Sequence, residues 1–177
     1  MIRVVLVDDH VVVRSGFAQL LSLEDDLEVI GQYSSAAQAW SALIRDDVNV
    51  AVIDIAMPDE NGLSLLKRLR AQKPQFRAII LSIYDAPTFV QSALDAGASG
   101  YLTKRCGPEE LVQAVRSVGL GGHYLCADAI RALRKMYQFN GAMAVQFSQH
   151  IGAMHMYRFM TEFEFKGDLF NAVSFDQ

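Results

Sequence analysis

Cysteines, prolines and long apolar runs are all scarce in this sequence. The 177 residues include two cysteines and four prolines. Cys106 and Cys126 lack the spacing of a metal site or a disulfide framework, so two thiols in a reducing compartment are the simplest interpretation. The apolar start of the chain reaches Asp8 and Asp9 too soon for a signal peptide or a membrane span. These absences predict a soluble, cytoplasmic protein with no membrane partner.

An excess of basic residues is also missing. The formal net charge is -4, with 16 Lys and Arg residues against 20 Asp and Glu residues. A broad nucleic-acid-binding surface needs clustered basic side chains, so the composition argues against one. Hydrophobic residues make up 51% of the chain, which is enough for one well-packed domain with residues to spare.

Short runs rich in Val and Ile alternate with longer segments in which apolar residues recur every three or four positions. The short runs predict five strands, at Arg3–Val7, Leu27–Ile30, Val50–Asp54, Ala78–Ser82 and Gly100–Thr103. The longer segments predict amphipathic helices. Strands that alternate with helices favour the α/β class, here a doubly wound five-stranded parallel sheet with helices on both faces.

The sequence changes character after residue 122. Residues 1–122 are predicted to form one domain, residues 123–138 a linker or an extra helix, and residues 139–177 a tail of unknown fold. Phenylalanines on both sides of Lys166–Asp168 hint at a hairpin in this tail. The tail has two basic residues against four acidic ones, so no DNA-binding helix-turn-helix is recognisable there.

Three aspartates and a lysine lie where predicted strands end. Asp8 and Asp9 follow the first strand, Asp54 ends the third and Lys104 follows the fifth. The carboxyl ends of parallel strands meet at one edge of a sheet, so these side chains are expected to converge. A single Asp is better explained as a turn or helix-cap residue. The combination instead predicts a Mg²⁺ site, because crowded carboxylates need a hard cation, with a lysine beside it that binds phosphate.

Four motifs at these positions resemble the response-regulator receiver family. They are Val7–His10, Asp54–Gly62, Leu81-Ser82 and Tyr101–Lys104, in the family's order. The resemblance runs from Met1 to about Leu125 and implies the flavodoxin-like receiver fold, followed by a C-terminal extension. Three further segments resemble the branch with LuxR-type helix-turn-helix outputs, closest to the regulator of hexose-phosphate uptake (UhpA type): Val13–Phe17, Lys104–Cys106 and Gly121–Leu125.

The resemblance implies a role for each matching acidic position. Asp54 would accept a phosphoryl group from a sensor histidine kinase, as an acyl phosphate. Asp9 and Asp54 would bind Mg²⁺ directly, Asp8 largely through water, and Ala56 through its backbone carbonyl oxygen. The protein would then be a phospho-acceptor switch, an enzyme only for its own phosphorylation and dephosphorylation.

The resemblance also implies how the signal leaves the site. Lys104 and the Ser82 hydroxyl would bind phosphoryl oxygens, and Tyr101 would turn inward as Ser82 moves. The surface formed by the fourth helix, the fifth strand and the fifth helix would change as a result. His10 is expected to be a solvent-facing loop residue, with a contact at the edge of the site as the alternative.

Three hypotheses for the function remain open. The first is a phospho-switch whose output is a protein contact, with homodimerisation expected. The second is a LuxR-type transcription regulator whose DNA-binding output is missing or degenerate in this chain. Either the chain signals through its receiver alone, or the tail is an unrelated module, a truncation product or a frameshifted segment. The third, a flavin protein or phosphatase on the same fold, ranks lowest, because Asp8 and Asp9 put negative charge where a flavin needs a phosphate-binding loop.

Overall fold

The computed structural model describes the backbone of residues 1–45 and 47–140 and the side chains of residues 1–45 and 47–136. The hairpin predicted in the tail lies outside these residues. The chain divides into two compact units, Met1–Met136 and Tyr137–Gln177. The first unit contains the whole sheet and the predicted site.

The sheet is parallel and contains six strands in the order β2-β1-β3-β4-β5-β6. The strands are β1 (Ile2–Val7), β2 (Leu27–Tyr33), β3 (Val50–Asp54), β4 (Ala78–Ser82), β5 (Gly100–Thr103) and β6 (Tyr124–Leu125). The predicted α/β class and doubly wound parallel sheet are confirmed. The predicted number of five strands is corrected to six, because the two residues of β6 are too few to give a period-two pattern in the sequence.

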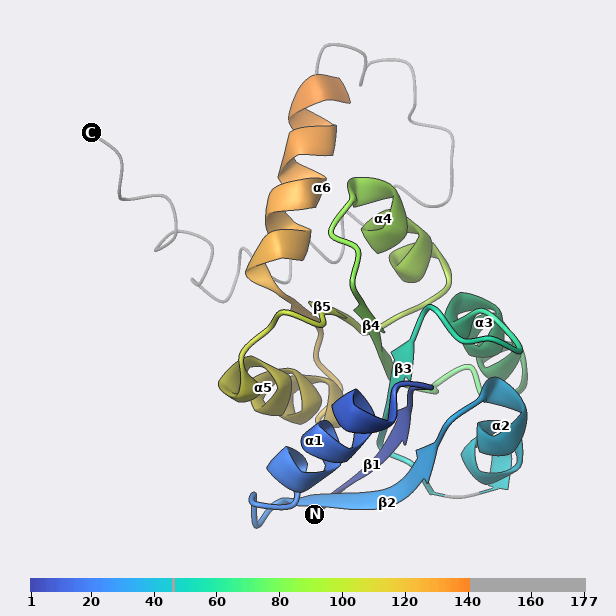
Figure 1. Cartoon of the computed structure of the whole chain (residues 1–177). Coiled ribbons are helices and arrows are strands. Elements are labelled where there is room, and N and C mark those ends of the chain that lie inside the picture. The colour runs from blue at the N-terminus through green and yellow to red at the C-terminus, as the bar shows by residue number, and fades with distance from the viewer. Residues whose placement is uncertain (46, 141–177) are drawn as a thin grey trace. The chain divides into compact units, whose positions relative to one another are not determined.

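The described part of the chain contains six helices (Figure 1). They are α1 (Val11–Leu21), α2 (Ala36–Arg45), α3 (Gly62–Gln72), α4 (Pro87–Asp95), α5 (Pro108–Gly119) and α6 (Ala127–Asn140). Helices α1 to α5 pack against the sheet. Helices α1 and α5 contact each other on one face, while α2 and α3 pack together on the other. Helix α5 begins with Pro108 and has Glu109 and Glu110 in its first turn, as the sequence predicts.

The core lies along the central strands. Every residue of β3 and β4 is buried, which explains why their sequences are almost continuously apolar. The edge strand β2 is instead partly exposed along its length. The strand order changes direction between β1 and β3, so the crevice at the carboxyl ends of these two strands is the expected location of a functional site.

Candidate functional site: a carboxylate cluster at the ends of β1 and β3

The aspartates predicted to converge lie together in the structure. Strands β1 and β3 pair in parallel with Val7 opposite Ile53, so the residues that follow each, Asp8 and Asp54, are neighbours. Asp9 is the next residue along the chain. Asp8 and Asp54 are buried and Asp9 is partly exposed. One side-chain oxygen from each of these aspartates and a ring nitrogen of His10 all lie within 4.8 Å of one another.

Lys104 joins two of the carboxylates. Its Nζ atom lies 2.8 Å from Oδ2 of Asp54 and 2.9 Å from Oδ2 of Asp8, and its side chain is only 10% exposed. Burial alone would lower the pKa of Lys104, but its hydrogen bonds to Asp54 and Asp8 raise the pKa above the ordinary value. Lys104 therefore stays positively charged at neutral pH.

The cluster keeps negative charge even with Lys104 in place. Burial raises the pKa of the Asp54 carboxyl; the hydrogen bond from Lys104 opposes this rise, and the charge of Asp8 adds to it. With all groups ionised, the three carboxylates carry three negative charges and Lys104 one positive charge, which leaves two. The oxygen donors and the residual charge both fit a divalent cation.

Ser82 and Tyr101 lie beside the cluster and share a partner. Ser82 ends β4, next to β3, and is 1% exposed. Its Oγ accepts a hydrogen bond from the backbone N–H of Tyr84, at 3.0 Å. Tyr101 of β5 is fully buried, and its hydroxyl donates to the carbonyl oxygen of Tyr84 at 2.6 Å. Tyr101 therefore points inward in this structure, and burial raises its pKa to about 12.

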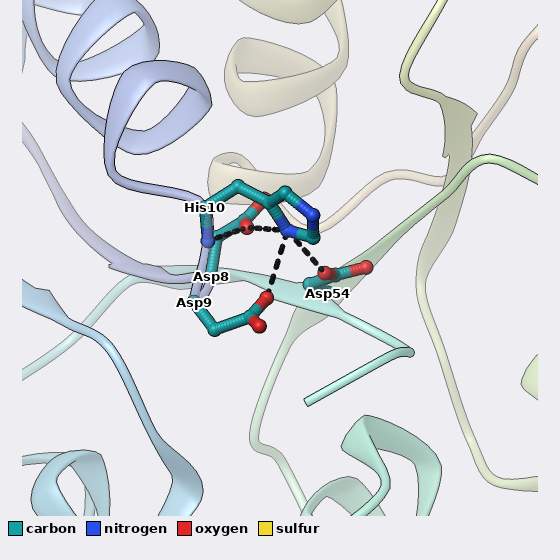
Figure 2. Close-up of side chains that lie close together, drawn as sticks. All are labelled: Asp8, Asp9, His10 and Asp54. Carbon is teal, nitrogen blue, oxygen red and sulfur yellow. Dashed lines mark hydrogen bonds and ion pairs between the residues drawn. The ribbon is translucent and has the colours of Figure 1, made fainter. Parts of the chain in front are cut away.

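His10 lies closer to the cluster than the sequence suggests. It is the residue before α1, and its side chain is 60% exposed, as expected for a residue facing solvent. Its Nδ1 atom nevertheless lies 2.8 Å from Oδ1 of Asp9 and 3.2 Å from Oδ1 of Asp8 (Figure 2). The alternative in which His10 contacts the edge of the site is the arrangement in the structure.

The loop between β3 and α3 holds the remaining predicted residue. Ala56 is exposed, and its backbone N–H points to Oδ1 of Asp54 at 3.3 Å. Asp59 in the same loop accepts hydrogen bonds from the backbone N–H groups of Ala36 and Ala37, at 3.3 and 2.9 Å, and so caps the start of α2. This role of Asp59 leaves no local pattern in the sequence, because the segments it joins are more than 20 residues apart.

The comparisons with known proteins agree with this geometry. The family model of the response regulator receiver domain matches residues 4–116. The chain belongs to the response regulator receiver family. This receiver is 50% identical to the transcriptional regulatory protein UhpA of Salmonella typhimurium over 129 residues, which cover 72% of this chain and 64% of UhpA. The chain therefore spans less than two thirds of the length of UhpA.

Other relatives place the receiver among regulators of the LuxR type. The DNA-binding transcriptional activator DevR/DosR of Mycobacterium tuberculosis is 39% identical over 146 residues, which cover 82% of this chain and 66% of DevR/DosR. The crystal structure of a LuxR-family two-component response regulator from Aurantimonas superposes with a TM-score of 0.74 at 28% identity, covering 77% of this chain and 97% of that one. The predicted resemblance to the receiver family and its LuxR-type branch is confirmed.

No helix in residues 1–45 and 47–140 combines the length and the apolar character needed to cross a lipid bilayer.

Proposed function

We propose that this receiver is a cytoplasmic phospho-acceptor switch in which Asp54 takes a phosphoryl group from a sensor histidine kinase. The observation that carries the proposal is the convergence of Asp8, Asp9, Asp54 and Lys104 at one edge of the sheet. A carboxylate oxygen of Asp54 would bond to phosphorus as the bond between phosphorus and the kinase's histidine nitrogen breaks, and the imidazole leaves with the electron pair. The product is an acyl phosphate on Asp54.

The residues around Asp54 are suited to this transfer, which depends on alignment and on neutralising charge. Asp9 is the most accessible of the carboxylates, while Asp8 is held by Lys104 and by the backbone N–H of His10. These contacts support Asp9 as a direct Mg²⁺ ligand and Asp8 as a ligand through water; Asp54 and the carbonyl of Ala56 are the further direct ligands that we propose. Bound Mg²⁺ would supply positive charge to the carboxylates and the phosphoryl oxygens.

The proposal predicts that Mg²⁺-dependent phosphorylation requires Asp54. Incubation of the full chain with a small phosphodonor such as acetyl phosphate should add one acid-labile phosphoryl group, and only when Mg²⁺ is present. Intact-mass spectrometry measures the added group. The Asp54→Asn variant keeps the size of the side chain and removes the nucleophile, so it should gain none. Equal incorporation by the variant would refute the assignment of Asp54.

We expect Tyr84 to transmit the conformational change from the phosphorylation site. Oγ of Ser82 now accepts the N–H of Tyr84, and its hydroxyl would donate to a phosphoryl oxygen on Asp54, so a shift of Ser82 toward the phosphoryl group would pull on Tyr84. Tyr84 is also held by the Tyr101 hydroxyl, and its ring stacks on Phe89 of α4 with centroids 4.4 Å apart. A movement of Ser82 would thus reach α4 and β5, which supports a change on the surface formed by α4, β5 and α5.

We expect this surface change to promote homodimerisation. Light scattering of the full chain should show a larger mass after phosphorylation, whereas Asp54→Asn treated in the same way should keep the mass of the untreated protein. The same mass with and without the phosphoryl group would mean that the output is not oligomerisation. A DNA-binding output is the alternative, since relatives of this chain are named as DNA-binding regulators. A gel shift with the phosphorylated full chain separates the two. If dimerisation alone is the output, the DNA probe should remain unshifted.

The phosphorylated state is expected to be long-lived. Backbone N–H groups of Ala56 and Tyr84 hydrogen-bond the side chains of Asp54 and Ser82, so Ala56 and Tyr84 flank the position at which the phosphoryl group would lie. Ala56 has no polar side-chain group to orient an attacking water, and the size of the side chains of Ile83 and Tyr84 is expected to limit the access of water to the phosphoryl group. A water-positioning group commonly contributes about 10² or more in rate.

Polar replacements at these positions should therefore speed the loss of phosphate. We expect the double variant Ala56→Asn, Tyr84→Glu to release phosphate up to about 10²-fold faster than the wild type. The Ala71→Asn variant is the matched control, since Ala71 is exposed near the end of α3 and is not one of the residues of the site. If the double variant and the control decay at the same rate, the lifetime is set elsewhere.

A further inference from the structure

The imidazole of His10 faces the carboxylate cluster through one nitrogen. In Figure 2 every dashed contact of the ring leaves from Nδ1, and these contacts reach Asp8, Asp9 and Asp54. The distances are 2.8 Å to Asp9, 3.2 Å to Asp8 and 3.8 Å to Asp54. The backbone N–H of His10 also donates to Oδ1 of Asp8, at 2.8 Å, which fixes the start of α1 against the cluster.

These spacings match the donors of a single metal ion. Ligand atoms about 2.1 Å from a cation lie roughly 3.0 Å apart in an octahedral shell and about 3.4 Å apart in a tetrahedral one. The distance from Nδ1 to Oδ1 of Asp9, a proposed direct ligand, is 2.8 Å and falls close to the octahedral value. When the ring carries its proton on the outer nitrogen, the lone pair of Nδ1 is free to bind a cation.

Lys104 and His10 contact different oxygen atoms of Asp8. The Nζ atom of Lys104 binds the Oδ2 atoms of Asp8 and Asp54, whereas the contacts of His10 to Asp8 and Asp9 are made with the Oδ1 atoms and only its longer contact to Asp54 is with Oδ2. Nζ lies 3.5 Å from Nδ1. The ammonium and a divalent cation therefore have separate oxygen atoms on Asp8, and two negative charges remain for the cation to neutralise.

We propose that His10 is a nitrogen ligand of the divalent cation site, which makes this receiver selective for a transition-metal ion such as Mn²⁺ over Mg²⁺. The inference rests on the proposed function, because it assumes that a divalent cation binds among the three carboxylates. Imidazole is a good ligand for first-row transition metals, whereas Mg²⁺ strongly prefers oxygen. Removing the imidazole should therefore weaken the binding of Mn²⁺ much more than the binding of Mg²⁺.

The test compares Mn²⁺ and Mg²⁺ binding to the full-length wild type and to His10→Gln by isothermal titration calorimetry. Even groups that only support a ligand commonly contribute about 10- to 100-fold in affinity, so His10→Gln should lower the preference for Mn²⁺ by about 10-fold or more. The matched control is His123→Gln, which removes a histidine that hydrogen-bonds the carbonyl of Ser99 instead of the carboxylates. The preference of the His123→Gln variant for Mn²⁺ over Mg²⁺ should equal that of the wild type.

Pulsed electron paramagnetic resonance of bound Mn²⁺ gives a second, direct measurement. The wild type should show coupling to a coordinated ¹⁴N nucleus, and His10→Gln should not. An unchanged preference, tighter binding of both ions to His10→Gln, or no nitrogen coupling in the wild type would each overturn the inference while leaving the phosphorylation proposal standing. If the wild type binds neither ion and Asp9→Ala behaves identically, the proposed cation site fails, and the inference with it.

Discussion

Replacing Gly62 with alanine is expected to lower the free energy of unfolding by about 2–4 kcal/mol, because the new methyl group has no space. A Cβ atom on Gly62 would lie 2.0 Å from the carbonyl oxygen of Asp54 and 3.0 Å from a methyl carbon of Ile53. The backbone N–H of Gly62 also donates to the carbonyl oxygen of Ile55, at 3.0 Å. The clash is with backbone atoms, so the start of α3 or the end of β3 has to move.

Gly16 provides a matched control for this substitution. It lies in α1, and a Cβ atom built on it would meet nothing within 4 Å. Alanine is a better helix former than glycine, so Gly16→Ala should raise stability by roughly 0.5–1 kcal/mol. Urea denaturation measures both variants. If Gly62→Ala unfolds at the same urea concentration as the wild type, α3 does not pack as closely against the backbone of Asp54 as the structure indicates.

Replacing Lys104 with methionine should destabilise the metal-free protein by about 3 kcal/mol or more. Lys104 is the buried cation that compensates Asp8 and Asp54, and removing one partner of a buried ion pair commonly costs about 3–5 kcal/mol. The pKa of Lys104 is raised in the fold, so its contribution is fully present below its ordinary pKa of 10.5 and is lost only as the pH rises through the higher folded value.

Lys67→Met is the control for Lys104→Met. Lys67 is exposed on α3, and a surface substitution of this kind usually changes stability by no more than about 0.5 kcal/mol. Chemical denaturation at pH 7 with a chelator should show the difference, and added Mg²⁺ should restore part of the loss in Lys104→Met by compensating the same carboxylates. Equal stabilities of the two variants would contradict the role of Lys104 in the cluster.

The sequence was sufficient to predict where Asp54 and Lys104 meet. Both follow strongly apolar strands, and parallel pairing brings the carboxyl ends of β3 and β5 to one edge of the sheet. The alternation of strands and helices was enough for the architecture, because the central strands are buried on both faces and their sequences are correspondingly apolar.

Other features depend on contacts that no local pattern encodes. The contact of His10 with Asp9 depends on how the chain turns from β1 into α1. The sequence alone does not show this turn, because a histidine after two aspartates is equally compatible with a solvent-facing loop. Asp59 caps a helix that precedes it by more than 20 residues, so its role is visible only once both segments are folded. The need for glycine at position 62 arises from the carbonyl of Asp54, although the backbone there is ordinary helix.

The central claim is that Asp54 is the phosphorylated residue, and borohydride trapping tests it most directly. Reduction of an aspartyl phosphate converts that residue to homoserine, which peptide mass spectrometry locates within the sequence. After incubation of the full chain with acetyl phosphate and Mg²⁺, we predict homoserine at position 54 and at no other aspartate, with none formed when Mg²⁺ is omitted. Homoserine at Asp8, Asp9 or another position, with Asp54 unchanged, would contradict the account.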